Sequence, residues 1–346
     1  MGGAINMSDT LLDVRNLTVK YKTSNGMLTA VSNASFTVEE GQFLGLVGES
    51  GCGKSTLVKT IMGALDNNGK ITDGKIYFQG NKIIDANNEL TNEKGKWTDI
   101  SWIPQAAMNS LDPIERINKQ AYTIAKAHTD LSQTQVDEKL KEMFDIVGIP
   151  KNRITDYPHQ FSGGMKQRTL IALSLFLEPS LLIADEPTTG LDVIMQDQVI
   201  NYLEEIQDEL NLSVLIITHD ISVVFEMCDW IAVMHSGQLV EEGHIERVYD
   251  QTSHPYSILL QESLPDLRHP DQELKVIEGD PPQNIGRMNY CSFANRCPWE
   301  IEECTAVSPS LETVSSNVEE DDEQHDHNVA CIRKDTVRSE IHGGER

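Results

Sequence analysis

The sequence contains no apolar run that could span a membrane. A spanning helix needs about 20 consecutive apolar residues, and the longest apolar run here lies near residues 170–177. Residues 1–12 also lack the basic segment and apolar core of a secretion signal. We therefore expect a cytoplasmic chain, which lies peripherally on the cytoplasmic face of the cell membrane only if a partner holds it there.

Basic residues are also scarce. The chain has 28 Lys and Arg against 54 Asp and Glu, which gives a formal net charge of −26. Sequence-independent binding of nucleic acid needs basic side chains on the phosphates, so this charge argues against a nucleic-acid partner. It also destabilises a compact state by self-repulsion unless salt screens it. The composition fits adaptation to a salt-rich cytosol, as in halophiles, or merely an acidic mesophilic surface.

What the sequence does contain is a loop that suits phosphate binding. The loop reads Gly48-Glu49-Ser50-Gly51-Cys52-Gly53-Lys54-Ser55-Thr56 and follows the apolar residues 43–47. A strand that leads into such a loop lets backbone N–H groups wrap phosphates, while the next helix points its positive end at them. Lys54 can reach the terminal phosphates, and the Ser55 hydroxyl can bind Mg²⁺. We expect these residues to form a nucleotide site.

A second glycine-rich turn follows about 110 residues later. It reads Phe161-Ser162-Gly163-Gly164-Met165-Lys166-Gln167-Arg168 and stands at the start of an apolar, helical-looking stretch, residues 169–177. Ser162, Gly163 and Gly164 form a second candidate anion site, although one phosphate loop has no need of another.

Two neighbouring carboxylates end a predicted buried strand. Asp185 and Glu186 follow the apolar residues 181–184 and precede Pro187. Ligands of α/β sheets bind at strand ends, so Asp185 is suited to hold Mg²⁺ and Glu186 to deprotonate the attacking water. The alternative interpretation is a pair of surface acids in a turn.

Three single residues complete the candidate site. His219 closes a second predicted strand and is suited to contact the γ-phosphate, although a lone histidine is usually structural. Gln105 follows an apolar segment and is suited to bind Mg²⁺ or the attacking water. Tyr21 is suited to stack on adenine, or it is a half-buried strand tyrosine.

The remaining pattern predicts an α/β fold around this site. Alternating residues 11–21 and 28–38, with Asn25-Gly26 between them, indicate an antiparallel β layer. Strands at 181–184 and 214–217 around a helix at 193–210 indicate a parallel sheet. Further predicted elements are strands at 75–78 and 100–103, a helix at 57–65, a helical insertion at 111–157 with its clearest amphipathic segment at 135–147, and a hairpin at 230–242.

After about residue 261 the composition changes to a linker and a small tail with cysteines. Cys291, Cys297, Cys304 and Cys331 are separated by five, six and 26 residues, which are not zinc-finger spacings. A cytosolic location disfavours disulfides, and a tail with little core suggests a metal staple: an iron–sulfur cluster or zinc. Free or oxidised thiols are the alternative. Residues 312–327 carry seven acidic residues and no Lys or Arg, which predicts a solvated insertion. Cys52 and Cys228 are interpreted as small packing residues.

Together these motifs resemble one superfamily, the ATP-binding-cassette (ABC) ATPases. In chain order, the matching parts are the phosphate loop, Gln105, the signature turn at 161–167, the acidic strand end at 181–187, Gly190-Leu191-Asp192 and His219. The resemblance covers about residues 10–260. It implies a P-loop NTPase core with an antiparallel β subdomain, an inserted helical subdomain at about 106–178, and ATP and Mg²⁺ as ligands.

A narrower group is also similar, the ATPase subunits of oligopeptide and dipeptide importers. The similarity lies in the phosphate loop and in three further parts: Asn109-Ser110-Leu111-Asp112-Pro113, His254-Pro255-Tyr256, and the cysteine tail at 261–346. This resemblance implies import of a peptide, nickel, sugar or another solute, and it favours a [4Fe–4S] cluster over zinc at the four cysteines.

The resemblance also implies partners. ATP would sit between the phosphate loop of one subunit and the Ser-Gly-Gly turn of another. Phe161 and Met165 replace the ends of the commoner Leu-Ser-Gly-Gly-Gln, a form similar to the first of two ATPase subunits in peptide importers, so we expect a homologous mate. Two permease chains and an extracellular solute-binding protein are implied.

Two rival functions remain open at this point. One is a soluble ABC ATPase of DNA repair or translation, although such proteins usually carry two cassettes or a long coiled coil. The other is an exporter ATPase, against which the His-Pro-Tyr segment and the cysteine tail argue.

Overall fold

The computed structural model describes residues 10–86, 96–105, 110–189, 193–264, 277–282, 290–314 and 327–342. The chain divides into two compact units. The first unit comprises Met1–Thr37, Leu44–Thr91 and Thr218–Arg346, and the second comprises Val38–Phe43 and Asn92–Ile217. Among the predicted features, Asn109 and Gly190-Leu191-Asp192 lie outside the described residues.

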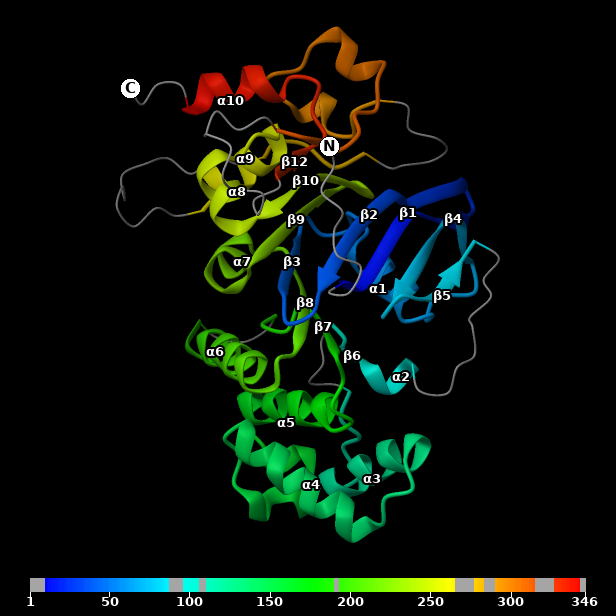
Figure 1. The fold of residues 1–346 in the computed structure, drawn as a ribbon, viewed down its shortest axis with the longest axis vertical. Coiled ribbons are helices and arrows are strands. Elements are labelled where there is room, and N and C mark those ends of the chain that lie inside the picture. Colours follow the sequence, from blue (N-terminus) through cyan, green and yellow to red (C-terminus); the bar gives the residue numbers. More distant parts are fainter. Residues whose placement is uncertain are drawn as a thin grey trace. The chain divides into compact units, whose positions relative to one another are not determined.

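An antiparallel sheet of four strands belongs to the first unit (Figure 1). Its order is β2-β1-β4-β5, and the strands are β1 (Thr10–Thr23), β2 (Gly26–Glu39), β4 (Gly69–Phe78) and β5 (Asn81–Asp85). Buried and exposed residues alternate along β1 and β2 because successive side chains of a strand point to opposite faces. The predicted antiparallel layer, with its turn at Asn25-Gly26, is confirmed.

Five strands of the second sheet belong to the first unit. Two of them, β11 and β12, come from the cysteine tail. The order of the five is β11-β12-β10-β9-β3. The strands are β3 (Phe43–Val47), β9 (Trp230–His235), β10 (Gln238–His244), β11 (Glu312–Thr313) and β12 (His327–Val329). β3 and β9 are parallel, whereas β9–β10 is the predicted antiparallel hairpin.

Two short strands stand at the ends of the predicted acidic insertion, residues 312–327. β11 pairs with β12, and β12 pairs with β10. Both residues of β11 are exposed, whereas His327 at the start of β12 is buried. Residues 315–326, between the two strands, lie outside the described residues.

The helices of the first unit begin with α1 (Lys54–Ile61), directly after the phosphate loop. It is shorter than the predicted helix at 57–65, because Gly63 adopts a left-handed conformation (φ 64°) that terminates it. The others are α7 (Ile221–Met227), α8 (Ile245–Gln251), α9 (Pro255–Glu262) and α10 (Lys334–His342).

Three parallel strands of the second sheet belong to the second unit: β6 (Ile100–Ile103), β7 (Leu181–Asp185) and β8 (Ser213–Thr218). All residues of β7 and β8 are buried, as expected of strands covered on both faces. The predicted parallel sheet is confirmed, and α6 (Val193–Leu210) has the predicted bounds.

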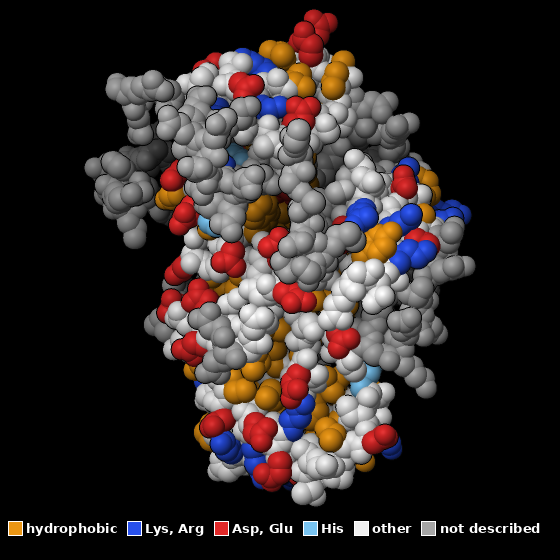
Figure 2. Space-filling view, in the orientation of Figure 1, with side chains coloured by type: hydrophobic (Ala, Val, Ile, Leu, Met, Phe, Trp, Pro, Cys, Tyr) orange, Lys and Arg blue, Asp and Glu red, His pale blue; other side chains and the backbone are white. Residues whose placement is uncertain are grey.

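The remaining helices of this unit are α2 (Lys96–Asp99), α3 (Ile117–His128), α4 (Gln133–Ile146) and α5 (Gly163–Leu175). α4 begins earlier than its amphipathic pattern at 135–147, because Ser132 and Gln135 form a capping box. Among the described residues, no helix is both long and apolar enough to cross a membrane. Figure 2 shows Asp and Glu side chains scattered over the face in view, with Lys and Arg between them.

Candidate functional site

Two glycines shape the phosphate loop between β3 and α1. A Cβ atom on Gly48 would lie 2.1 Å from the Met234 carbonyl oxygen. Gly53 has φ 115°, and a Cβ atom there would lie 2.3 Å from the Ala30 carbonyl oxygen. Both contacts are shorter than any side chain tolerates, so the tight path of the loop depends on these glycines.

Lys54 is held inside the loop. Its side chain is 5% exposed, and its Nζ donates to the carbonyl oxygens of Gly48 (2.5 Å) and Glu49 (3.0 Å). Cys52 is buried beside it, which confirms its interpretation as a packing residue. Ser55 is exposed in the first turn of α1, and Thr56 is half-buried. The Lys54 ammonium therefore lies in the loop and the Ser55 hydroxyl at the start of α1. Phosphates and Mg²⁺ are commonly bound at such positions.

A pocket of about 390 Å³ adjoins the loop within the first unit. Its lining residues are Thr23, Asn25, Leu28, Thr29, Ala30, Ser50, Gly51, Cys52, Ser236, Gly237, Pro281 and Pro282. Two segments far apart in sequence, the β1–β2 hairpin and the proline pair of the linker, thus line one pocket together with the phosphate loop. Nothing in the sequence pattern of the linker indicates this arrangement.

Tyr21 and His219 also belong to the first unit. Tyr21 lies near the end of β1, half-buried, and pairs in register with Gly69 of β4. His219 is exposed immediately after β8. The next residue, Asp220, caps α7 by accepting a hydrogen bond from the Ser222 N–H (3.0 Å). His219 therefore lies between the end of β8 and the start of a capped helix.

In the second unit, the signature turn begins helix α5. Ser162 is its N-cap, and the hydroxyl accepts a hydrogen bond from the Met165 N–H (3.3 Å). Ser162 and Gly163 are exposed at the positive end of a 13-residue helix, while Gly164 is buried. This geometry suits an anion supplied from outside the chain. The buried Gln167 amide donates to the Pro187 carbonyl (2.8 Å), which connects α5 to the segment after β7.

The carboxylate pair lies at the carboxyl end of β7. Asp185 is 2% exposed, and Glu186 has a left-handed backbone, φ 51°. A non-glycine residue in this region is strained, and such strain concentrates at functional sites. The Glu186 N–H donates to the Ile217 carbonyl (2.7 Å), so β8 helps to hold the unusual conformation.

Two polar side chains orient the Glu186 carboxylate. Gln105 Nε2 donates to Glu186 Oε2 (2.7 Å), and Thr189 Oγ1 donates to the same oxygen (3.0 Å). The structure therefore brings together Gln105 and Glu186, 81 positions apart in sequence. The sequence analysis did not identify Thr189. The one available signal was its position three residues after Glu186.

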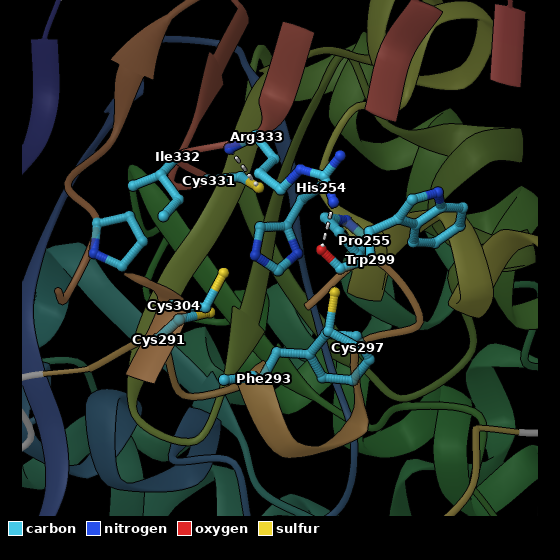
Figure 3. Close-up of a pocket in the computed structure, with 12 residues that line it drawn as sticks. His254, Pro255, Cys291, Phe293, Cys297, Trp299, Cys304, Cys331, Ile332 and Arg333 are labelled. Carbon is cyan, nitrogen blue, oxygen red and sulfur yellow. Dashed lines mark hydrogen bonds between the residues drawn. The ribbon is translucent and has the colours of Figure 1, made fainter. Parts of the chain in front are cut away.

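The four tail cysteines line a single pocket in the first unit (Figure 3). Cys291 and Cys304 are neighbours, since the Cys291 N–H donates to the Cys304 carbonyl (2.9 Å). Burial raises the pKa of Cys297 to about 12 and that of Cys331 to about 11. These thiols are therefore neutral near pH 7 unless a cation lowers their pKa values.

The donor set of this pocket is sulfur-rich and suits a soft metal or a cluster. In the part of the chain that the structure describes, however, no three His, Cys, Asp or Glu side chains are arranged to hold one metal ion. The predicted magnesium ligands, Ser55, Gln105 and Asp185, are divided between the two units.

A buried carboxylate supports the tail and was not singled out from the sequence. Glu241 is fully buried in β10 and accepts hydrogen bonds from the N–H groups of Ser253 (2.7 Å) and His254 (3.2 Å) and from His327 (2.8 Å). His254 in turn caps α9, where Nδ1 accepts from the Tyr256 N–H (3.1 Å). Glu241 therefore connects the His-Pro-Tyr segment to tail strand β12.

The strand–loop–helix at Lys54, the capped signature turn and the strained acid after β7 together define an ATP-binding-cassette protein. Comparison with known proteins agrees. The family model described as ABC transporter matches residues 31–189, and the model described as the C-terminal region of oligopeptide/dipeptide transporters matches residues 240–304.

Whole-chain relatives narrow this class. The oligopeptide transport ATP-binding protein OppD of Haemophilus influenzae is 41% identical and is matched over 88% of this chain and 94% of its own length. The dipeptide transport ATP-binding protein DppD of Lactococcus lactis is 40% identical over 83% of each chain. The chain belongs to this family of oligopeptide and dipeptide transport ATP-binding proteins.

Solved structures share the fold. CbiO1 of Clostridium perfringens, part of an ABC transporter complex, has a TM-score of 0.60 and 27% identity, with 72% of this chain and 93% of that chain covered. The ATP-binding cassette MJ0796, solved as a dimer with ADP and phosphate, has a TM-score of 0.57 and 27% identity, with 68% and 99% covered. Both likenesses support the predicted P-loop fold.

Proposed function

We propose that this chain is the ATP-hydrolysing subunit of an importer of dipeptides or oligopeptides. The observation that carries the proposal is the oriented Glu186 carboxylate, held by Gln105 and Thr189, in a chain that also has a complete phosphate loop. The substrate class is supported by the names of the relatives and by the match of the C-terminal region to peptide transporters.

In this proposal, the site residues divide nucleotide binding and hydrolysis between them. Lys54 and the loop amides at 48–56 bind the phosphates of ATP, and Tyr21 stacks on adenine. Glu186 takes the proton of the attacking water, which is oriented by Gln105, and His219 contacts the γ-phosphate. Ser55, Gln105 and Asp185 would hold Mg²⁺, which would supply positive charge near the phosphate oxygens.

The active form is proposed to be a pair of ATPase subunits. Ser162, Gly163 and Gly164 present an anion site that this chain's own loop does not need, so they would serve the nucleotide of the mate. The Phe161 and Met165 form of the turn favours a homologous mate. The dimer of MJ0796 with ADP and phosphate shows that such cassettes can pair.

The chain works with permease subunits and is proposed to be peripheral to the membrane at its cytoplasmic face. Two permease chains and an extracellular solute-binding protein complete the proposed importer. Reconstitution tests this: with ATP supplied to this chain, vesicles that contain the partners should take up a labelled dipeptide. Uptake of nickel or a sugar alone would reject the peptide, and outward transport would reject import.

We further propose that the cysteine pocket binds a [4Fe–4S] cluster. A single zinc ion needs its ligands around one point, an arrangement that the described residues do not offer. A cubane cluster instead binds each of its four thiolates at a different iron, which suits four cysteines spread around a pocket. Anaerobically purified protein should contain about four irons and four sulfides per chain; one zinc, or no metal, would reject the cluster.

The acidic composition is proposed to reflect a salt-rich cytosol. Figure 2 shows acidic side chains scattered between basic ones and not gathered in one patch. The electrostatic repulsion that salt would screen therefore comes from the total charge of −26. Screening of this charge should raise the melting temperature between 0.1 M and 1 M KCl, because the Debye length falls from about 10 Å to 3 Å. A melting temperature that does not rise would favour the mesophilic interpretation.

A further inference from the structure

Arg296, in the cysteine tail, forms an ion pair with Glu49 of the phosphate loop. Arg296 lies in the short helical turn Ala294–Arg296, directly before Cys297. Its Nη1 and Nη2 donate to Glu49 Oε2 and Oε1, each at 2.7 Å. The arginine side chain is 5% exposed and that of Glu49 is 26% exposed. A partly buried bidentate pair of this kind is stronger than a surface ion pair, and it joins residues 247 positions apart.

The guanidinium is itself held in place. Its Nε donates to the Glu278 carbonyl (3.0 Å), and Nη1 lies 3.3 Å from His235 Nε2. Because arginine can only donate, Nε2 must accept, so Nδ1 carries the proton and donates to Ser292 Oγ (2.9 Å). The ring of Phe293 lies under the guanidinium, 5.7 Å away. These contacts give Arg296 one orientation.

The backbone of the loop is held by a second C-terminal residue. The Glu49 N–H donates to the Tyr256 hydroxyl (2.8 Å). Tyr256 is fully buried, and its ring packs against Phe293 (5.4 Å) and His235 (4.7 Å). Segments after β9 therefore fix both the main chain and the side chain of Glu49.

A displacement of Glu49 would reach Lys54 directly. Lys54 Nζ donates to the carbonyls of Gly48 and Glu49, and the backbone at Gly48 packs so closely that a Cβ atom there would lie 2.1 Å from the Met234 carbonyl oxygen. The position of the lysine thus depends on the main-chain conformation that Arg296 and Tyr256 hold. Preorganised donors bind an anion more tightly because less ordering is lost on binding.

We propose that Arg296 is a positioning residue for ATP binding: through its bidentate contact with Glu49, the cysteine tail fixes the phosphate loop in its binding conformation. The inference rests on ATP binding at this loop. It predicts a weaker affinity for ATP when the contact is lost, with little change in the turnover of ATP once it is bound, because the contact acts on the loop and not on the attacking water.

The test compares four forms of the full chain: wild type, Arg296→Ala, Arg296→Lys and the control Lys334→Ala. Lys334 is also in the tail and forms an exposed ion pair with Glu312 (2.5 Å), so its loss changes the charge equally. Equilibrium binding gives the Kd for Mg-ATP, and steady-state hydrolysis gives KM and kcat. We expect Arg296→Ala to raise Kd and KM about tenfold, or ~1.4 kcal/mol, with kcat within about twofold and the control unchanged.

Arg296→Lys separates positioning from long-range attraction of ATP. Lysine keeps the positive charge but cannot make the bidentate contact, so positioning predicts most of the loss, whereas a Kd like that of the wild type would overturn the proposal. If Arg296→Ala fails to fold, Glu49→Gln provides the second variant. In the Glu49→Gln background, replacement of Arg296 by Lys should have little further effect on Kd; an undiminished effect would show that Arg296 does not act through Glu49.

Failure of the inference and failure of the ATP site are distinguishable. If the wild type binds Mg-ATP and both Arg296 variants bind it equally well, only the role of Arg296 is wrong. If the wild type itself does not bind Mg-ATP, the assignment of the phosphate loop is wrong. Thermal unfolding of each variant shows whether a raised Kd reflects a partly unfolded sample.

Discussion

The phosphate loop and the acid after β7 are held in different ways. Around the loop, Lys54 is buried, glycines leave no room for side chains, and Glu49 is tied by a bidentate ion pair and a tyrosine hydroxyl. Around Glu186, two exposed hydrogen bonds hold a carboxylate on a strained backbone. The phosphate loop is therefore held by buried contacts, whereas Glu186, the proposed catalytic base, is held by exposed hydrogen bonds. Binding and hydrolysis should accordingly respond differently to substitution.

The largest effect is expected at Glu186. Glu186→Gln keeps the shape of the side chain but removes the base, so kcat for ATP hydrolysis should fall by roughly 10²–10⁴-fold, while the Kd for Mg-ATP stays within about threefold. The matched control is Glu205→Gln, an exposed acid on α6. Hydrolysis at the wild-type rate in Glu186→Gln would show that Glu186 is not the base.

Substitution of Lys54, in contrast, should weaken the binding of Mg-ATP. Lys54→Ala removes a charge-assisted donor from the loop, which corresponds to about 1.5–3 kcal/mol, or roughly 10- to 150-fold in the Kd for Mg-ATP. Lys59→Ala is the control in the same helix, because Lys59 forms an exposed ion pair with Asp66 (3.0 Å). Isothermal titration measures both. Equal affinities for Lys54→Ala and wild type would place the phosphates elsewhere.

Many of the secondary-structure elements and site residues can be predicted from the sequence. The strands around 181–184 and 214–217, the helix at 193–210 and the hairpins follow from apolar periodicity and turn residues, which are local signals. Gln105 and Glu186 were both singled out, although only the structure shows the bond between them.

What the sequence could not predict depends on long-range contacts. Arg296 and Glu49, or Glu241 and His327, lie far apart in the chain, and no period in the sequence connects them. The strands β11 and β12 contain only two and three residues, too few for a periodic pattern. Their acidic surroundings pointed instead to a solvated segment.

The free energy of unfolding should depend on pH through His235, which lies beside Arg296. Burial lowers the pKa of His235 to about 4, below its ordinary value near 6.5, and a positive charge on it would face Arg296 (3.3 Å). A depressed pKa means that its stabilising contribution is present above pH 6.5 and is lost as the pH falls toward 4. The loss should approach about 1.4 kcal/mol per pH unit within that window.

Chemical denaturation between pH 7.5 and 4.5 measures this dependence. His235→Gln should have a flatter pH profile of unfolding free energy than the wild type, because glutamine takes up no proton. His128→Gln, at an exposed histidine near the end of α3, serves as the control. A wild-type profile that His235→Gln leaves unchanged would show that His235 is not the titrating group.

The smallest effect is expected from the two side chains that orient Glu186. Each contributes one exposed hydrogen bond to Oε2, from Gln105 Nε2 (2.7 Å) or Thr189 Oγ1 (3.0 Å), and such a bond contributes about 0.5–1.5 kcal/mol. Gln105→Ala and Thr189→Ala should therefore each lower kcat by roughly two- to tenfold. Thr189→Ala should leave the Kd for Mg-ATP unchanged, whereas Gln105→Ala should also raise it, because Gln105 is a proposed Mg²⁺ ligand. Thr123→Ala, at an exposed threonine of α3, should change neither quantity. Because both donors share one oxygen, the double variant should lose less than the product of the single losses. A raised Kd in Thr189→Ala would mean that the contacts around Glu186 also support nucleotide binding, and the contrast between the phosphate loop and Glu186 would then be wrong.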